Sequence, residues 1–150
     1  MDLLEDDYED DDDLECLEEA NSPKGFDSIV GNMFGHLLKF KHQSDKQTSM
    51  WVKTINRNST DIIKLYPKLR PTDRSDITNN IDSYLDDRFE DGLNLFRSDT
   101  GLELNIPRYR DWDFDFIFNR ARIKEFLLKN LNRRNKIDIS VERTIYESFR

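Results

Sequence analysis

One apolar repeat constrains the fold of this chain more than any other feature. Large apolar side chains recur between residues 26 and 38 at spacings of three and four, which place them on one face of a helix. Ser22 and Pro23 precede the repeat, where a capping hydroxyl and a residue without an N–H group favour a helix start. The pattern therefore predicts an amphipathic helix over about residues 23–43. Its apolar residues are Phe26, Ile29, Val30, Met33, Phe34, Leu37 and Leu38.

Two glycines interrupt this otherwise bulky helix. Gly31 and Gly35 lie four residues apart, so both face the same side. A helix surface without side chains lets a neighbouring helix come closer than usual. We therefore expect a second helix to pack tightly against this position.

Three more helices are predicted downstream. Thr48 or Ser49 caps a helix that ends before Pro67, and Trp51 at its start is expected to be buried and to close one end of the bundle. After a turn at residues 67–71, a long helix is predicted from about Asp73 to Gly101, with its acids and Arg88 mostly on the solvent side. A last helix is predicted over residues 121–131. Expected buried positions of the two middle helices are Trp51, Ile55, Ile62, Ile63, Tyr66, Ile77, Ile81, Tyr84, Leu85, Phe89 and Phe96.

The aromatic segment between residues 102 and 119 has no clear helical period. Its WDFDFIF stretch alternates as strands do, but no partner strand is evident, so we expect an extended segment lying over the bundle. The final residues are ambiguous, because Ile137, Ile139 and Val141 alternate like a strand whereas residues 142–149 could be helical.

Composition favours an all-α, small helical bundle formed by residues 13–150 as a single domain. Hydrophobic and charged residues each make up 36% of the chain, and there are only 5 Gly and 4 Pro, which is typical of a helix-rich protein with a modest core. No apolar run approaches the ~20 residues that a membrane span needs, so we expect no membrane association. Cys16 is the single cysteine and cannot form an internal disulfide, which favours a cytoplasmic location.

The N-terminus is strongly acidic. Residues 1–20 contain 12 Asp or Glu and no Lys or Arg, so the net charge of −8 becomes −8 + 12 = +4 without them. Residues 1–12 are expected to be disordered, because like charges repel and nothing apolar repeats there. Two interpretations stay open: a solvated acidic tail, or a tail that shields a basic face or mimics nucleic acid for a partner.

An ordered series of short matches to a known family runs from residue 14 to residue 118. The matching positions are Leu14-Glu15, Glu18-Glu19, His36-Leu37-Leu38-Lys39, Gln43, Ser49, Trp51, Ile55, Arg57, Pro67, Leu69, Tyr84, Asp99-Thr100-Gly101-Leu102 and Ile106-Pro107. This series resembles a bacterial family known only as domain of unknown function 29. Asp87 departs from it, since the family usually carries Ala near that position. The resemblance implies an all-helical bundle in which His36, Lys39, Trp51, Arg57 and Tyr84 are family-motif positions; it supplies no catalytic residue.

Candidate catalytic and metal-binding groups are weak. His36 and His42 lie six apart, whereas metal-binding pairs usually lie three or four apart, so a hydrogen-bonded structural His36 is favoured over one in a carboxylate-paired site. Asp82, Asp86 and Glu90 form a four-residue ladder that could hold a hard cation but is more typical of a solvated face. No phosphate loop, nucleotide fingerprint or zinc spacing is present. We expect no catalytic residue, metal or cofactor.

One basic cluster follows the aromatic segment. Its cations could bind phosphates or acidic side chains, with nearby Phe116, Phe118 and Phe126 available to stack on bases if exposed. A solvated helix surface, or an intramolecular partner for the acidic tail, is the simpler interpretation. The sequence therefore predicts a non-catalytic, cytoplasmic helical module that binds a protein partner, with a nucleic-acid-associated regulator or nuclease as the alternative. The cluster comprises Arg120, Arg122, Lys124, Lys129, Arg133, Arg134 and Lys136.

Overall fold

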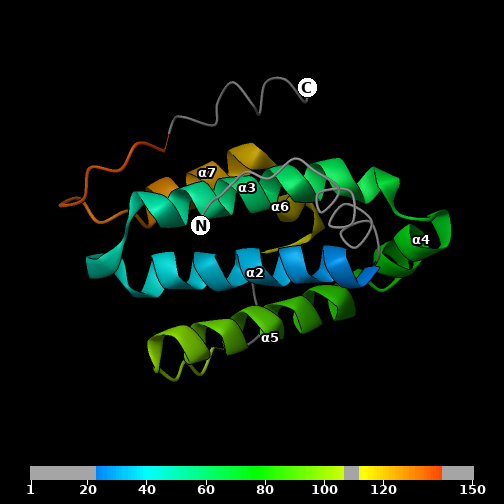
Figure 1. Cartoon of the computed structure of the whole chain (residues 1–150), viewed down its shortest axis with the longest axis horizontal. Helices are drawn as coiled ribbons and strands as arrows, with labels where there is room; N and C mark the ends of the chain where they lie inside the picture. Colours follow the sequence, from blue (N-terminus) through cyan, green and yellow to red (C-terminus); the bar gives the residue numbers. More distant parts are fainter. Residues whose placement is uncertain (1–22, 107–111, 140–150) are drawn as a thin grey trace, which may run out of the picture.

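The structure, a computed structural model, describes residues 23–106 and 112–139, which form helices and no strand (Figure 1). This confirms the all-α bundle. The expectations for residues 1–12 and for residues 140–150 lie outside the described residues. The helices are α2 (Pro23–His42), α3 (Ser49–Leu65), α4 (Pro71–Asn79), α5 (Ile81–Thr100), α6 (Phe114–Phe118) and α7 (Arg120–Lys129), with short 3-10 helices η1 (Ser44–Lys46) and η2 (Tyr66–Lys68).

Helix α2 is the centre of the bundle. It lies between α3 and α5, as Figure 1 shows, and α7 also contacts it. Phe26, Val30 and Phe34 are fully buried, and six of the seven residues of the predicted repeat belong to the buried core. The predicted helix and its apolar face are confirmed.

The crossing of α2 and α5 is built on glycines. A Cβ added to Gly35 would lie 2.6 Å from Cδ2 of Leu95, and one added to Gly92 would lie 2.7 Å from both the Gly35 backbone N and the Phe34 Cβ. Carbon atoms in contact normally stay about 3.5–4.0 Å apart, so a side chain at Gly92 would overlap the α2 backbone, whereas one at Gly35 would require the Leu95 side chain to shift. The close approach predicted from Gly31 and Gly35 is therefore confirmed, and Gly92 supplies its other half.

Local signals at the helix ends are largely confirmed. Thr48 caps α3, its Oγ1 accepting a hydrogen bond from the Trp51 N–H at 3.2 Å. Gly101 ends α5 with a left-handed φ of 72°, a conformation that favours glycine.

The predicted third helix is wrong as a single element. The chain instead forms α4, which starts at Pro71, and α5, with Asn80 between them at φ −123° and ψ 40°. Asn80 Nδ2 donates to the Asp76 carbonyl at 3.0 Å, a local bond of the kind by which Asn competes with continued helix. The expected solvent position of Arg88 is also wrong, because its side chain lies against Asp27 of α2 with 3.2 Å between Nη1 and Oδ2.

The aromatic segment precedes the last described helix, as predicted, but its final part is helical rather than extended. Asp113 Oδ1 accepts from the Phe116 N–H at 2.7 Å and caps α6. Phe114 and Phe118, four residues apart, place their ring centroids 4.7 Å apart, a contact that the helical turn creates. Trp112, just before α6, is only 4% exposed and stacks on Phe34 at 4.8 Å.

The expected burial of Trp51 is wrong in degree. Trp51 is half-buried and packs on the edge of the core, whereas Trp112 is the tryptophan inside it. Trp51 is the third residue of α3, so it lies in the first turn of the helix, where its ring is only partly covered.

Gly92→Ala tests the crossing. Alanine favours a helix over glycine by about 1 kcal/mol, so propensity alone predicts a more stable protein. We expect instead a loss of about 1–3 kcal/mol in the free energy of unfolding, because the new methyl overlaps the α2 backbone. Urea unfolding measures it beside Ser98→Ala, at an exposed position of α5. A Gly92→Ala protein as stable as the wild type would contradict the close crossing.

The two tryptophans are predicted to differ in stability contribution. Trp112→Ala should cost about 3–5 kcal/mol, the usual range for truncating a buried aromatic, and Trp51→Ala clearly less. Parallel urea titrations of both variants measure the difference. Equal losses would mean that the two rings are equally buried in solution.

Candidate anion-binding pocket

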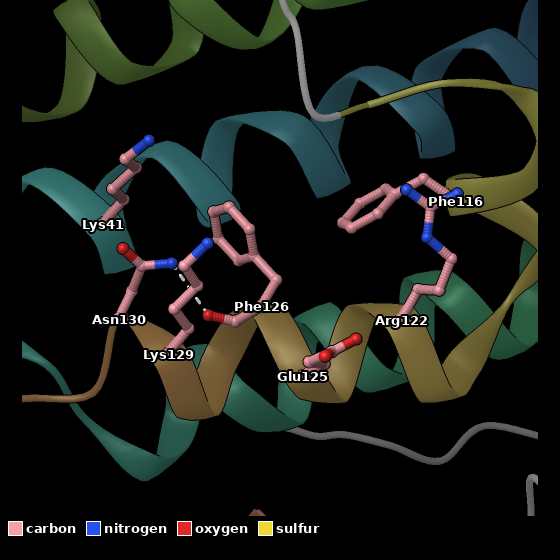
Figure 2. A pocket seen from close by; sticks show the side chains of 7 residues that line it. All are labelled: Lys41, Phe116, Arg122, Glu125, Phe126, Lys129 and Asn130. Atoms are coloured by element: carbon pink, nitrogen blue, oxygen red, sulfur yellow. Dashed lines mark hydrogen bonds between the residues drawn. The ribbon is translucent and has the colours of Figure 1, made fainter.

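A pocket of about 330 Å³ lies between the end of α2 and helices α6 and α7 (Figure 2). Lys41 contributes from the last turn of α2, and Phe116 contributes from α6. The remaining residues come from α7 and its C-cap. Three side chains are cationic and one is a carboxylate, so the pocket favours an anion. Its lining comprises Lys41, Phe116, Arg122, Glu125, Phe126, Lys129 and Asn130.

Arg122 is held in place by its neighbours. Its Nη1 lies 2.9 Å from Oδ1 of Asp113, the same oxygen that caps α6. Its guanidinium also lies 5.7 Å from the centroid of the Phe116 ring, within cation–π range. One carboxylate thus fixes both the start of α6 and one cation of the pocket.

Lys41 and Lys129 are the available cations. Both side chains are exposed, and among the described residues neither has an acidic partner within salt-bridge distance. Figure 2 shows Lys41 on α2 and Lys129 near the end of α7, both at one end of the pocket, with Phe116 and Arg122 at the other end. An incoming anion would therefore not have to displace an existing ion pair at either lysine.

The aromatic residues form a closed floor rather than a stacking platform. Phe116 and Phe126 are 2% and 8% exposed, with ring centroids 6.0 Å apart at 77°. Trp112 stacks behind Phe116 at 6.2 Å and joins these rings to Phe34 in the core. The two rings therefore offer little surface on which a nucleic-acid base could stack.

Gln47 ties α7 to the α2–α3 connection. Its Nε2 donates to the carbonyls of Phe40 and Asn130, each at 2.7 Å, and its Oε1 accepts from the Asn132 N–H at 2.8 Å. The side chain is 6% exposed. These three bonds hold the α7 end opposite Lys41 and so set the width of the pocket.

The structure separates the predicted basic cluster into four parts. Arg120 is 3% exposed and donates through Nη1 to Thr60 Oγ1, so it lies inside the bundle. Arg122 and Lys129 line the pocket, whereas Lys124 is half-buried and outside its lining. The others are exposed in the segment after α7: Arg133, Arg134 and Lys136.

Sequence reasoning missed Lys41 and Gln47. Lys41 belongs to the basic last turn of α2. The helix dipole alone favours a cation there, so its position did not indicate a binding site. Gln47 carries no local pattern at all. Binding by the predicted cluster remains a prediction.

None of the family-motif positions lines the pocket, and two of them, Lys39 and Tyr84, make contacts between helices. Lys39, 8% exposed, forms an ion pair with Asp99 at the end of α5. Tyr84 Oη donates to Asp27 Oδ1 at 2.6 Å, and burial, followed by that hydrogen bond, raises the pKa of Tyr84. Arg57 is exposed.

Among the described residues no group of three or more His, Cys, Asp or Glu is arranged to hold a metal, and Asp82 and Glu90 of the predicted ladder face solvent.

His36 lies half-buried beside this ion pair. Its Nδ1 donates to the Asn32 carbonyl at 3.0 Å, which supports the structural interpretation. Burial is the main cause that lowers the pKa of His36, while the Asn32 bond acts in the opposite direction. The neutral imidazole is therefore the form that fits the folded protein.

Gln47→Ala should lower the free energy of unfolding by about 2–4 kcal/mol, because buried partners lose their hydrogen bonds. Urea unfolding compares it with Gln43→Ala, a nearby half-buried glutamine with no side-chain hydrogen bond among the described residues. Equal effects would show that Gln47 is not a clamp.

His36 should make folding sensitive to mild acid. A pKa lowered in the folded state means that the unfolded chain binds the proton more tightly, so stability is complete above about pH 7 and falls as the pH drops through about 6.5. We expect His36→Gln to flatten the fall in urea midpoint between about pH 7.5 and 5.5. His42→Gln is measured beside it, because burial also lowers the pKa of His42 and this histidine contributes its own part of the fall in stability. An unchanged slope in His36→Gln would contradict the assignment.

Comparisons with known proteins identify a family. No curated protein and no solved structure matches the chain. None of the described helices is both long enough and apolar enough to cross a membrane. The model of a family described as Domain of unknown function DUF29 matches residues 12–123, which is most of the chain and nearly the span of the motif series. The chain therefore belongs to the DUF29 family.

Proposed function

We propose that this chain is a non-catalytic binding module that holds an acidic segment of a partner protein in the pocket between α2 and α7. The observation that carries the proposal is the pair of exposed lysines, Lys41 and Lys129, in one pocket lining with the fixed guanidinium of Arg122. Cations held on separate helices around one concave surface can pair with several carboxylates of one partner segment. Surface charges alone attract weakly and with strong salt dependence.

The closed aromatic floor favours a protein over a nucleic acid. Base stacking would need exposed rings, and Phe116 and Phe126 are buried. Glu125 in the pocket wall would repel the anionic groups of either ligand, but only a peptide also offers main-chain N–H donors that this carboxylate can accept. A cytoplasmic location is part of the proposal and is supported by the single cysteine, which cannot form an internal disulfide.

The test substitutes Lys41→Gln and Lys129→Gln together and measures binding of a fluorescent peptide of alternating Asp and Ser. We expect at least a tenfold loss of affinity at low salt, about 1.4 kcal/mol, and a much smaller difference at high salt. Lys53→Gln with Lys64→Gln is the matched control, because these lysines are exposed on α3 and do not line the pocket. Equal binding by both double variants would overturn the proposal.

A second probe distinguishes the alternative function. A single-stranded oligonucleotide should bind more weakly than the acidic peptide at equal charge and salt. Tighter oligonucleotide binding, lost on changing Arg133, Arg134 and Lys136 to Gln, would instead support the nucleic-acid interpretation.

A further inference from the structure

We infer that the chain's own acidic N-terminal segment, residues 1–20, binds this pocket in the same molecule and competes with an acidic partner. The competition rests on the proposed function. The contact between segment and pocket does not, because it needs only the pocket and the charges of this chain.

Charge complementarity is the first argument. The segment carries 12 acids and no base, whereas the pocket holds Lys41, Lys129 and Arg122 against one carboxylate in its lining. The rest of the chain has a net charge of −8 + 12 = +4. Lys41 and Lys129 have no acidic partner among the described residues, so an intramolecular carboxylate would meet cations still open to pairing.

Reach is the second argument. Lys41 follows Pro23, the first residue of α2, by 41 − 23 = 18 helical residues, which at about 1.5 Å each is about 27 Å. The run Asp10–Asp13 precedes Pro23 by ten to thirteen residues, which span up to about 33–43 Å when extended at about 3.3 Å each. The acids can therefore reach the pocket when the segment is extended along α2.

Tethering is the third argument. Attachment to α2 keeps the segment near the pocket at an effective concentration on the order of millimolar. A weak electrostatic contact is then occupied within one molecule, yet a partner with more suitable chemistry can displace it. Added salt should release it as well.

Zero-length carbodiimide cross-linking of the full chain tests the contact. The reagent activates a carboxyl group, and a lysine amine that touches it forms an amide with net loss of water. Peptide mapping should find residues 1–20 joined to Lys41 and Lys129 several-fold more often than to Lys53 and Lys64, and this excess should fall at high salt. An even distribution over the exposed lysines would overturn the inference.

Two further measurements complete the test. The cross-linked fraction of monomer should not change with protein concentration, and cross-links found only in dimers would overturn binding within one molecule.

Changing Asp10, Asp11, Asp12 and Asp13 to Asn in the full chain should reduce the cross-links and tighten acidic-peptide binding several-fold. Unchanged peptide affinity, with the cross-links lost, would overturn the competition. Cross-links to the pocket lysines without any peptide binding would support the contact while refuting the proposed function.

Discussion

The close approach of α2 and α5 at Gly31, Gly35 and Gly92 is the constraint on which the rest of this structure depends. A Cβ at Gly92 would collide with the backbone of α2, so the two helices meet almost backbone to backbone. They run parallel, because Gly31 meets Asp91 and Gly35 meets Leu95 in a constant register. A parallel pair needs a long return connection, which α3 and α4 provide. α2 is thereby enclosed, with α5 on one side and α3 on the other.

Polar pairs fix the register at both ends of this crossing. Near the start of α2, Asp27 accepts from Tyr84 at 2.6 Å and pairs with Arg88 at 3.2 Å. Near its end, buried Lys39 pairs with Asp99. Such pairs add little net stability, because burying charge costs solvation, but a sliding helix would leave them unpartnered. The glycines allow the approach, and the polar pairs select one alignment.

The candidate pocket is a consequence of this core rather than a separate feature. Phe34, between the glycines, stacks on Trp112, and Trp112 stacks in turn on Phe116 of the pocket floor. Gln47 then closes the other end by joining the α2 terminus to the end of α7. The cations therefore sit on a floor continuous with the most tightly packed part of the molecule. This gives the pocket a defined shape and places its chemistry at the rim, where Lys41 and Lys129 are exposed.

The sequence alone determined the features that depend on neighbours a few residues away. These are the span and buried face of α2, a cap at Thr48 or Ser49, the end of α5 at Gly101, the need for a close helix at Gly31 and Gly35, and the family. Periodicity and capping act within one or two turns, so they are legible in the chain. Only the tertiary structure decided that Arg120 is buried, that Trp112 and not Trp51 enters the core, and that Lys41 faces Lys129 across 88 residues of sequence. Those outcomes depend on which helix faces pack together, and helix packing is set by contacts between distant segments that no local pattern records.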